Sequence, residues 1–514
     1  MDEFDFFGKL LGVGFIGAVA AFGGWQVTQN EQEIKRMTQI IDDVNRDERK
    51  IVVDECLLQN NGFYLPANEI FMLSNSGGMQ ALALTGNASA YNVVISGGKD
   101  NYIRNKSLIT IIEDVHSHNI PIIILHCSNT DLEQKLVTLP AYRSNKVKFI
   151  NGISHNYGVF SGMNSLEISD LIFSSMPDKY KNSLSSRNFI RIMSEMIILQ
   201  NLTPTLHHMV NWKDYDLGPI ITKQMRDNKT LATNYATLNE AYKRCQLDGE
   251  YLRYYFTGLK NQIKTVYDTA NTNVNITKAI DNNEIVSLNV GDNSNDLLIN
   301  LVTHHLQHVI HKGHNFMLIV DNINLHTYKE LLQLILLNRQ CKFVLCHDDL
   351  CANIHSDKAM FSNIMGNVQK YIIYSHFNQD TCDTWSKELG EYTKIDYTIT
   401  IGSQRNHIYA GKNKSLIISR KHGERRVPSS VLKKLCDHQV CVYDIANKAI
   451  FFTDTSGYNK NVVNNNLQKT RKQKGLWNKM THLFGMKNMG SAPIKIRLYT
   501  RKQQTILRRL THLG

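Results

Sequence analysis

Short apolar runs alternate with segments of helical periodicity early in the chain. Residues 91–95 form an apolar run that ends at Ser96, Gly97 and Gly98, and residues 121–126 form a second run. Between them, residues 107–118 carry apolar side chains three and four positions apart, which predicts a helix. A strand, a helix and a second strand at this spacing make a βαβ unit, so the pattern predicts a parallel sheet.

The same alternation returns after residue 280. Apolar runs typical of buried strands, with helical stretches between them, occupy residues 284–290, 297–311, 315–320, 328–337, 342–346 and 370–374. The intervening residues 162–280 contain almost no strand pattern and carry apolar residues at helical spacing. We therefore expect an α/β fold, a doubly wound and mainly parallel sheet interrupted by an inserted all-helical domain.

The N-terminal residues predict a membrane anchor. Residues 6–25 are apolar and Gly-rich apart from Lys9, and about 20 apolar residues span a bilayer. A polar stretch with an apolar stripe follows at 26–52, and its basic residues predict that the bulk of the chain is cytoplasmic. We expect a single-pass protein of the cell membrane with an N-terminal membrane helix. The alternative is a hydrophobic helix that packs on a partner.

Composition indicates a folded protein with an uneven charge. Hydrophobic residues make up 42% of the 514 residues, which excludes a wholly disordered chain. The nine cysteines include no Cys-x-x-Cys pair, which favours reduced thiols over a disulfide framework.

The C-terminal tail carries the excess positive charge. After Asp454 there are thirteen Lys or Arg residues and no acidic residue, so the net charge of +12 leaves about −1 for the rest. Such a block is typical of an arm that contacts phosphates, or of a solvated tail. The candidate nucleic-acid-binding residues are Arg471, Lys472, Lys474, Lys479, Arg501, Lys502, Arg508 and Arg509.

The segment after residue 95 lies where a phosphate-binding loop would lie. Such a loop is Gly-rich, follows a strand and closes with Lys-Ser or Lys-Thr at the start of a helix. Lys106 and Ser107 supply the closing pair, but Asp100 and Asn105 stand where the two glycines belong. The sequence leaves open a working loop, a degenerate relic and an ordinary turn.

Two further features could carry chemistry. The apolar run at 315–320 ends at Asp321, as in folds that present a carboxylate to Mg²⁺, but Asn322 follows where a Glu would polarise water. The alternative is a carboxylate that caps the next turn. His304, His308 and His311 share one helix face, yet no nearby carboxylate or cysteine completes a zinc site, so no metal site is predicted.

The order of these elements resembles the coupling proteins of type IV secretion, the membrane-anchored hexameric ATPases that feed DNA into conjugation channels. The resemblance covers roughly residues 85–450. It is carried by the strand, polar turn and helix at 370–393, by residues 425–452, by the helical insertion and by the N-terminal segment. It implies a RecA-like core in which Lys106 and Ser107, after Gly97 and Gly98, bind nucleotide.

The resemblance also implies that Asp321 is the Mg²⁺-side carboxylate and that His347 stands at the sensor position where the family places Gln. This sequence departs from the family pattern at three places: the glycines of the loop, the second acidic residue after the strand and the sensor residue. These departures favour a member with weak or lost ATPase activity. Its cofactors are then ATP and Mg²⁺, or none. Implied partners are DNA or a relaxase–DNA complex, other channel components, a membrane and copies of the same chain in a hexamer.

The function expected is therefore a divergent coupling-protein-like component of a DNA-transfer system, and the sequence leaves open whether it is an enzyme. The alternatives are an active ATP-dependent DNA translocase and a membrane-tethered nucleic-acid-binding protein. The expected units are a membrane segment at 1–25, a juxtamembrane helix at 26–52, core parts at 53–161 and 281–455, the helical insertion at 162–280 and the tail at 456–514.

Overall fold

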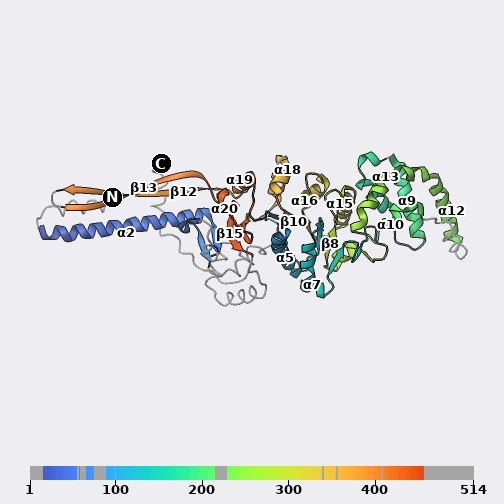
Figure 1. Cartoon of the computed structure of the whole chain (residues 1–514), viewed down its shortest axis with the longest axis horizontal. Coiled ribbons are helices and arrows are strands. Elements are labelled where there is room, and N and C mark those ends of the chain that lie inside the picture. The colour runs from blue at the N-terminus through green and yellow to red at the C-terminus, as the bar shows by residue number, and fades with distance from the viewer. Residues whose placement is uncertain are drawn as a thin grey trace.

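The computed structural model describes residues 16–54, 57, 65–73, 88–98, 100–181, 183–214, 229–337, 341–354, 357–406 and 409–455. The molecule is elongated. A helix and a long hairpin project at one end, a sheet lies in the middle and a group of helices forms the other end (Figure 1).

The described part of the chain builds a sheet of eleven strands in the order β2-β1-β15-β14-β11-β3-β10-β9-β4-β8-β5. Its strands are β1 (Ile51–Asp54), β2 (Phe71–Leu73), β3 (Val93–Ser96), β4 (Ile122–His126), β5 (Val147–Ile150), β8 (Ile285–Asn289), β9 (Met317–Asp321), β10 (Lys342–His347), β11 (Lys370–Ile373), β14 (Gln439–Asp444) and β15 (Ala449–Asp454). All neighbouring pairs are parallel except those that β14 makes with β11 and β15.

Helices cover both faces of this sheet, because the central strands are apolar on both sides. On one face, Val93 and Ile124 pack with Leu108 of α5 (Asn101–Ser117) and with α6 (Thr130–Val137). On the other face, Val94 and Ile123 pack with α15 (Asp296–His311) and α16 (Lys329–Leu337). The predicted α/β class with a mainly parallel, doubly wound sheet is confirmed.

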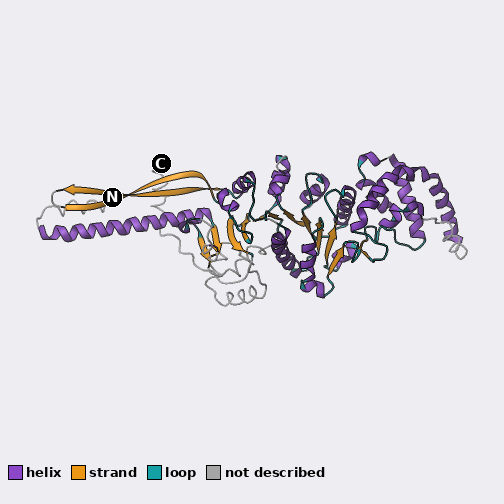
Figure 2. Cartoon of the chain, in the orientation of Figure 1, coloured by secondary structure: helices purple, strands orange, loops and turns teal. Residues whose placement is uncertain are grey.

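Shorter helices complete the connections between strands. They are α7 (Pro140–Arg143), α14 (Ile276–Asp281), α17 (Leu350–Ile354), α18 (Lys358–Asn367), α19 (Gln379–Glu388) and α20 (Ser429–Lys433), with the 3-10 turns η1 (Ala67–Glu69) and η2 (Ala88–Ala90). Figure 2 shows purple helices on either side of the orange strands in the middle of the molecule.

The chain leaves the sheet after β5 and returns before α14 through two short strands. These are β6 (Asn156–Tyr157) and β7 (Asn273–Val274), which pair in parallel. Between them the structure is helical and comprises α8 (Ser165–Ser175), η3 (Asp178–Tyr180), α9 (Ser183–Leu199), α10 (Leu206–Val210), η4 (Trp212–Asp214), α12 (Lys229–Arg244), α13 (Gln246–Gln262) and η5 (Ile263–Thr265).

Aromatic rings form the core of this helical segment. Phe189 packs edge-on against Trp212 at 5.0 Å and stacks with Tyr242 at 5.8 Å between ring centroids. Gly249 of α13 faces the same rings, and a Cβ there would lie 2.7 Å from Phe189 Cζ. The helix therefore approaches the rings as closely as a residue without a side chain allows.

The projecting arm consists of α2 (Ile16–Arg49) and the antiparallel hairpin β12 (Glu391–Asn406) and β13 (Tyr409–Arg425). The Asn45 side chain binds the backbone of Ile395 twice, at 2.8 Å each, and Lys414 contacts Glu31 at 2.5 Å. Ile34 and Ile41 of α2 are buried, so the apolar stripe of this helix is used within the arm.

The expected N-terminal membrane helix and cell-membrane localisation were wrong. Among the described residues, no helix combines the length and the apolar character that a bilayer crossing requires. Residues 1–15 lie outside the described residues. Residues 16–25 begin α2, which continues into polar sequence up to Arg49, and the Arg49 side chain is buried against Glu69 rather than placed as a flanking charge. The basic tail at 456–514, with Arg471, Lys472, Lys474, Lys479, Arg501, Lys502, Arg508 and Arg509, also lies outside the described residues.

Candidate functional site at the strand ends

Four parallel strands, β3, β10, β9 and β4, end side by side, and each ends in a buried polar residue. These residues are Ser96, His347, Asp321 and His126. Open α/β sheets bind ligands at the carboxyl ends of their strands, so this edge is the first place to look for chemistry. The predicted residues Asp321 and His347 are brought together here with the turn after β3.

The turn after β3 is short and tightly packed. Gly97 and Gly98 adopt φ angles of +95° and +87°, a region that favours glycine. A Cβ on Gly97 would lie 2.8 Å from the carbonyl oxygen of Tyr374. The Gly97 N–H donates to the His347 carbonyl at 3.2 Å, and the Gly98 N–H donates to the Ser375 carbonyl at 3.0 Å. Both glycine donors are thus bound to neighbouring strand ends.

A carboxylate caps the helix that follows this turn. The Asp100 side chain accepts a hydrogen bond from the Ile103 N–H at 3.1 Å, at the N-terminus of α5. The positive end of a helix dipole attracts a negative group, and in phosphate-binding loops that group is the ligand's phosphate. Here a side chain of the protein takes the position.

Arg104 fills the inner side of the same turn. Its side chain is 2% exposed, and its Nη1 donates to the carbonyl oxygens of Gly97 at 3.1 Å and Gly98 at 3.3 Å. Its Nη2 donates to the Asn101 side chain. Since a buried cation needs compensating acceptors, the two glycine carbonyls hold the guanidinium in place. No motif in the sequence predicts this role of Arg104.

Lys106 and Ser107 lie in the second turn of α5, beyond its N-terminus. The Ser107 side chain is fully buried, and its Oγ lies 2.6 Å from the Tyr374 hydroxyl. The Lys106 ammonium lies 5.2 Å from the centre of the Tyr102 ring. The structure therefore separates this pair from the turn that Gly97 and Gly98 form.

A helix that starts at Asn101 changes the register of the loop motif. The Gly-Lys-Ser/Thr positions directly before such a helix fall on Gly98, Lys99 and Asp100. Lys99 itself lies outside the described residues. The Gly-Lys dipeptide immediately after an apolar run could have indicated this register from the sequence. In this register Asp100 stands where a Mg²⁺-binding hydroxyl belongs.

Asp321 is 1% exposed at the end of β9. Its Oδ2 accepts a hydrogen bond from Asn129 Nδ2 at 2.6 Å, and its Oδ1 has no hydrogen-bond partner among the described residues. Cys346 stands beside it on β10, and burial, together with the Asp321 charge, raises the pKa of that thiol well above its usual range. Burial, then Asp321, likewise raises the pKa of Cys127 to about 12. Both thiols therefore stay protonated and uncharged near the Asp321 carboxylate.

Asn322 joins the turns of three strands. Its φ angle is +55°, its Nδ2 donates to Asn101 at 3.0 Å, and its Oδ1 accepts from the Asp348 N–H at 3.2 Å. Both ends of the amide are engaged with protein groups. Because an amide does not accept a proton at neutral pH, Asn322 acts as a brace between turns rather than as a base.

His347, at the predicted sensor position, ends the strand between β3 and β9. Its Nδ1 lies 2.7 Å from Asp348 Oδ1, and this hydrogen bond holds the pKa of the Asp348 carboxyl well below its usual range. A second histidine was not predicted. His376 is 4% exposed, lies 3.3 Å from Ser96 Oγ, and burial lowers its pKa to about 4.

Two of the three histidines on the predicted face of α15 lie beside carboxylates. His304 lies 2.6 Å from Glu330 and His308 lies 3.7 Å from Glu167. Within the described residues, no group of three His, Cys, Asp or Glu side chains is arranged to hold a metal ion.

Comparisons with known proteins return solved structures alone. No family model matches the chain, and no curated protein matches it. The structure of the bacterial conjugative coupling protein TrwB in its unbound monoclinic form is 13% identical, over 72% of this chain and 85% of that chain, with a TM-score of 0.43. TrwB with the non-hydrolysable ATP analogue ADPNP gives 13% identity, 72% and 86% coverage and a TM-score of 0.45. VirB4 of Thermoanaerobacter pseudethanolicus gives 10% identity, 66% and 91% coverage and a TM-score of 0.33. The solved structures to which this chain is similar thus include a coupling protein of the family that its sequence resembles.

Proposed function

We propose that this chain is a non-hydrolysing component of a conjugative or type IV secretion DNA-transfer system. It assembles with other channel components or docks DNA-bound substrates. The sequence resemblance supports the kind of system, and the strand-end site supports the absence of ATP turnover. The filled turn after β3 favours the case in which no cofactor is used over the case in which ATP and Mg²⁺ bind without being consumed.

The observation that carries the proposal is the filled turn after β3. A working loop wraps phosphates with free backbone N–H groups, and a lysine neutralises their charge. Here the N–H groups of Gly97 and Gly98 already donate to carbonyl oxygens of the neighbouring strands. Arg104 supplies a positive charge from within, and the Asp100 carboxylate caps the helix. A triphosphate would have to displace all of these contacts.

The Mg²⁺ side of the site supports the same reading. A catalytic Mg²⁺ keeps several waters and contacts a carboxylate that solvent reaches. Asp321 is 1% exposed and accepts a hydrogen bond from Asn129. Asn322 follows it in place of a second acid, with both ends of its amide bonded. The residues that would polarise an attacking water are therefore missing from these positions.

The basic tail supports the DNA-binding part of the proposal. Its thirteen Lys and Arg residues are interspersed with Trp477, Phe484 and Tyr499. Basic residues neutralise phosphates and aromatic rings stack on bases, which suits a single strand without sequence preference.

Phosphate release by the full chain, with Mg²⁺ and increasing DNA, tests the proposal. We expect the wild type to release phosphate at the rate of the buffer at every DNA concentration. Lys99→Ala and Lys106→Ala, the two possible loop lysines, should give the same flat traces. DNA-stimulated release that either substitution abolishes would instead identify an active translocase, the alternative function.

A further inference from the structure

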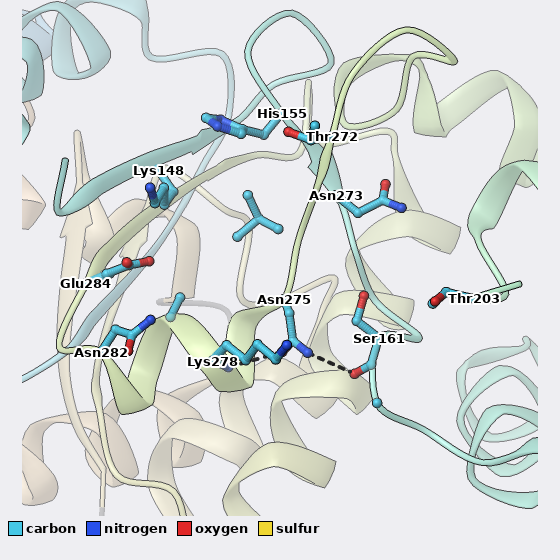
Figure 3. A pocket seen from close by; sticks show the side chains of 13 residues that line it. Lys148, His155, Ser161, Thr203, Thr272, Asn273, Asn275, Lys278, Asn282 and Glu284 are labelled. Carbon is cyan, nitrogen blue, oxygen red and sulfur yellow. Dashed lines mark hydrogen bonds between the residues drawn. The ribbon is translucent and has the colours of Figure 1, made fainter. Parts of the chain in front are cut away.

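A cavity of about 530 Å³ lies at the edge of the sheet, beside β5 and remote from the turn after β3. Two passages of the chain form its walls. Residues 155–162 lead from the sheet into the helical segment, and residues 272–284 lead back through β7 and α14 (Figure 3). The volume falls in the range of about 300–1,000 Å³ typical of sites for small molecules.

The charged groups around this cavity favour an anion. Lys148 reaches it from β5 and Lys278 from α14, whereas Glu284 is the single carboxylate among its lining residues. Lys148 donates to the Asn145 side chain at 3.0 Å. The Lys278 ammonium makes no ion pair or hydrogen bond within the described part of the chain. Two ammonium groups against one carboxylate leave a net positive charge for a ligand to neutralise.

Uncharged polar groups complete the lining. The side chains of Asn273, Asn282, Thr203 and Thr272 surround the cavity, together with those of Ser161 and Asn275. Asn275 Nδ2 donates to the Ser161 carbonyl at 3.2 Å, which ties the outgoing passage to the returning one. Amides and hydroxyls in this number match a ligand with several hydroxyl groups better than an apolar ligand.

A peptide strand is a poorer occupant than a small molecule. β5 is an edge strand, and edge strands can pair with an added strand. However, β5 has four residues, His155 Nδ1 lies 3.1 Å from the Phe149 carbonyl, and Ile150 is already bridged to His155. Little backbone remains to pair, and the His155 ring is held at the rim of the cavity.

We propose that this cavity binds a small phosphorylated and hydroxylated molecule, a sugar phosphate or a mononucleotide. The phosphate lies between the ammonium groups of Lys148 and Lys278, and the ligand's hydroxyls bond to the surrounding amides and to Glu284. Because the ligand touches both passages of the chain, it braces the helical segment against the sheet. The site is separate from the strand-end site and does not depend on the function proposed for it.

Calorimetric titration of the full chain with AMP and with ribose 5-phosphate tests this site. Inorganic phosphate and ribose serve as partial ligands, and thermal unfolding gives a second readout, since a ligand of the folded state raises Tm. We expect saturable binding of AMP or ribose 5-phosphate, weakened at least about tenfold in the double variant Lys148→Met and Lys278→Met, as the loss of charge-assisted hydrogen bonds implies. Lys434→Met, an exposed lysine after α20, is the matched control and should bind like the wild type.

Each other outcome overturns the proposal. No saturable binding of either phosphate ester would remove the site. Equal binding by the wild type and the double variant would place the ligand elsewhere. If inorganic phosphate bound as tightly as both esters, the ligand's hydroxyl groups would contribute nothing to binding, contrary to the proposal. Thermal unfolding of the double variant without ligand, compared with the wild type, shows whether the substitutions preserve the fold.

Discussion

Arg104 is a cation held where water does not reach. Its guanidinium is 2% exposed and bonds to the carbonyl oxygens of Gly97 and Gly98 and to Asn101. Burying a charge is costly unless it is hydrogen-bonded, and removing one partner leaves the others unsatisfied. Arg104 therefore holds the turn in its observed conformation, which in the proposed function excludes a phosphate.

This position predicts unequal effects of substitution at neighbouring basic residues. Arg104→Met should lower the free energy of unfolding by about 2–4 kcal/mol, because two buried carbonyl oxygens lose their donor. Lys106→Met, in the next turn of α5, should change it by no more than about 1 kcal/mol, because this half-buried side chain gives up one cation–π contact with Tyr102. Urea unfolding of the three proteins measures this. Equal effects would show that Arg104 does not support the turn.

Among single residues, those that directly follow an apolar run could be predicted from the sequence. Gly97, Gly98 and Asp321 stand at strand ends, where the run itself marks the position. Arg104 and Asn129 could not be predicted. No motif links Arg104 to the glycine carbonyl oxygens just before it, and Asp321, the partner of Asn129, lies 192 residues away. Lys106 and Ser107 were placed at the helix start since the length of the turn was not known, and α5 begins at Asn101.

Among the elements, the strands that alternate with predicted helices could be predicted, whereas β1, β2 and the hairpin of β12 and β13 could not. β3, β4, β9 and β10 are covered on both faces, so each is a continuous apolar run. β1 and β2 have four and three residues, too few for a periodic signal. The hairpin of β12 and β13 alternates polar and apolar residues along an arm, and nothing in its sequence indicates that α2 lies beside it.

Two helical glycines offer a matched test of the packing of elements. Gly249→Ala in α13 should lower the free energy of unfolding by about 1–3 kcal/mol, since the new Cβ would lie 2.7 Å from Phe189 Cζ and 2.8 Å from the Trp212 ring. Gly366→Ala in α18 should raise it by about 0.5–1 kcal/mol, because its Cβ would meet no atom within 4 Å and alanine favours a helix. Thermal or urea unfolding checks both. A neutral or stabilising Gly249→Ala would contradict the close approach of α13 to the rings.

In the whole molecule, the arm is fixed to the sheet by a buried charged cluster. Arg49 contacts Glu69 at 2.5 Å, Tyr392 donates to Glu69 at 3.0 Å, and Lys394 lies 3.1 Å from Glu69. Arg49 and Arg426 each donate to the other's carbonyl at 2.8 Å across 377 residues of sequence. These contacts join residues far apart in the sequence, so the sequence did not indicate that the helix expected beside a membrane, at 26–52, forms part of an arm with its last residue, Arg49, bound at the base.

The basic tail makes a prediction about the molecule as a whole. Deleting residues 456–514 removes thirteen positive charges and should weaken DNA binding. It should also reduce the slope of log K against log salt, because each phosphate contact contributes about one to that slope. Fluorescence anisotropy with labelled DNA over a range of salt concentrations measures both. An unchanged slope would show that the tail is not the part that contacts DNA.

Labelled ATP, titrated with Mg²⁺ against the full wild-type chain and against Arg104→Met, tests the central claim most directly. The claim is that the protein's own side chains fill the nucleotide position at the strand ends. ATP could also bind in the cavity beside β5. The double variant Lys148→Met and Lys278→Met weakens binding there, so it is titrated as well. We predict that the double variant, in which the cavity no longer binds nucleotide, shows no saturable binding of ATP. Saturable ATP binding that persists in the double variant would contradict the account, whether or not phosphate is released.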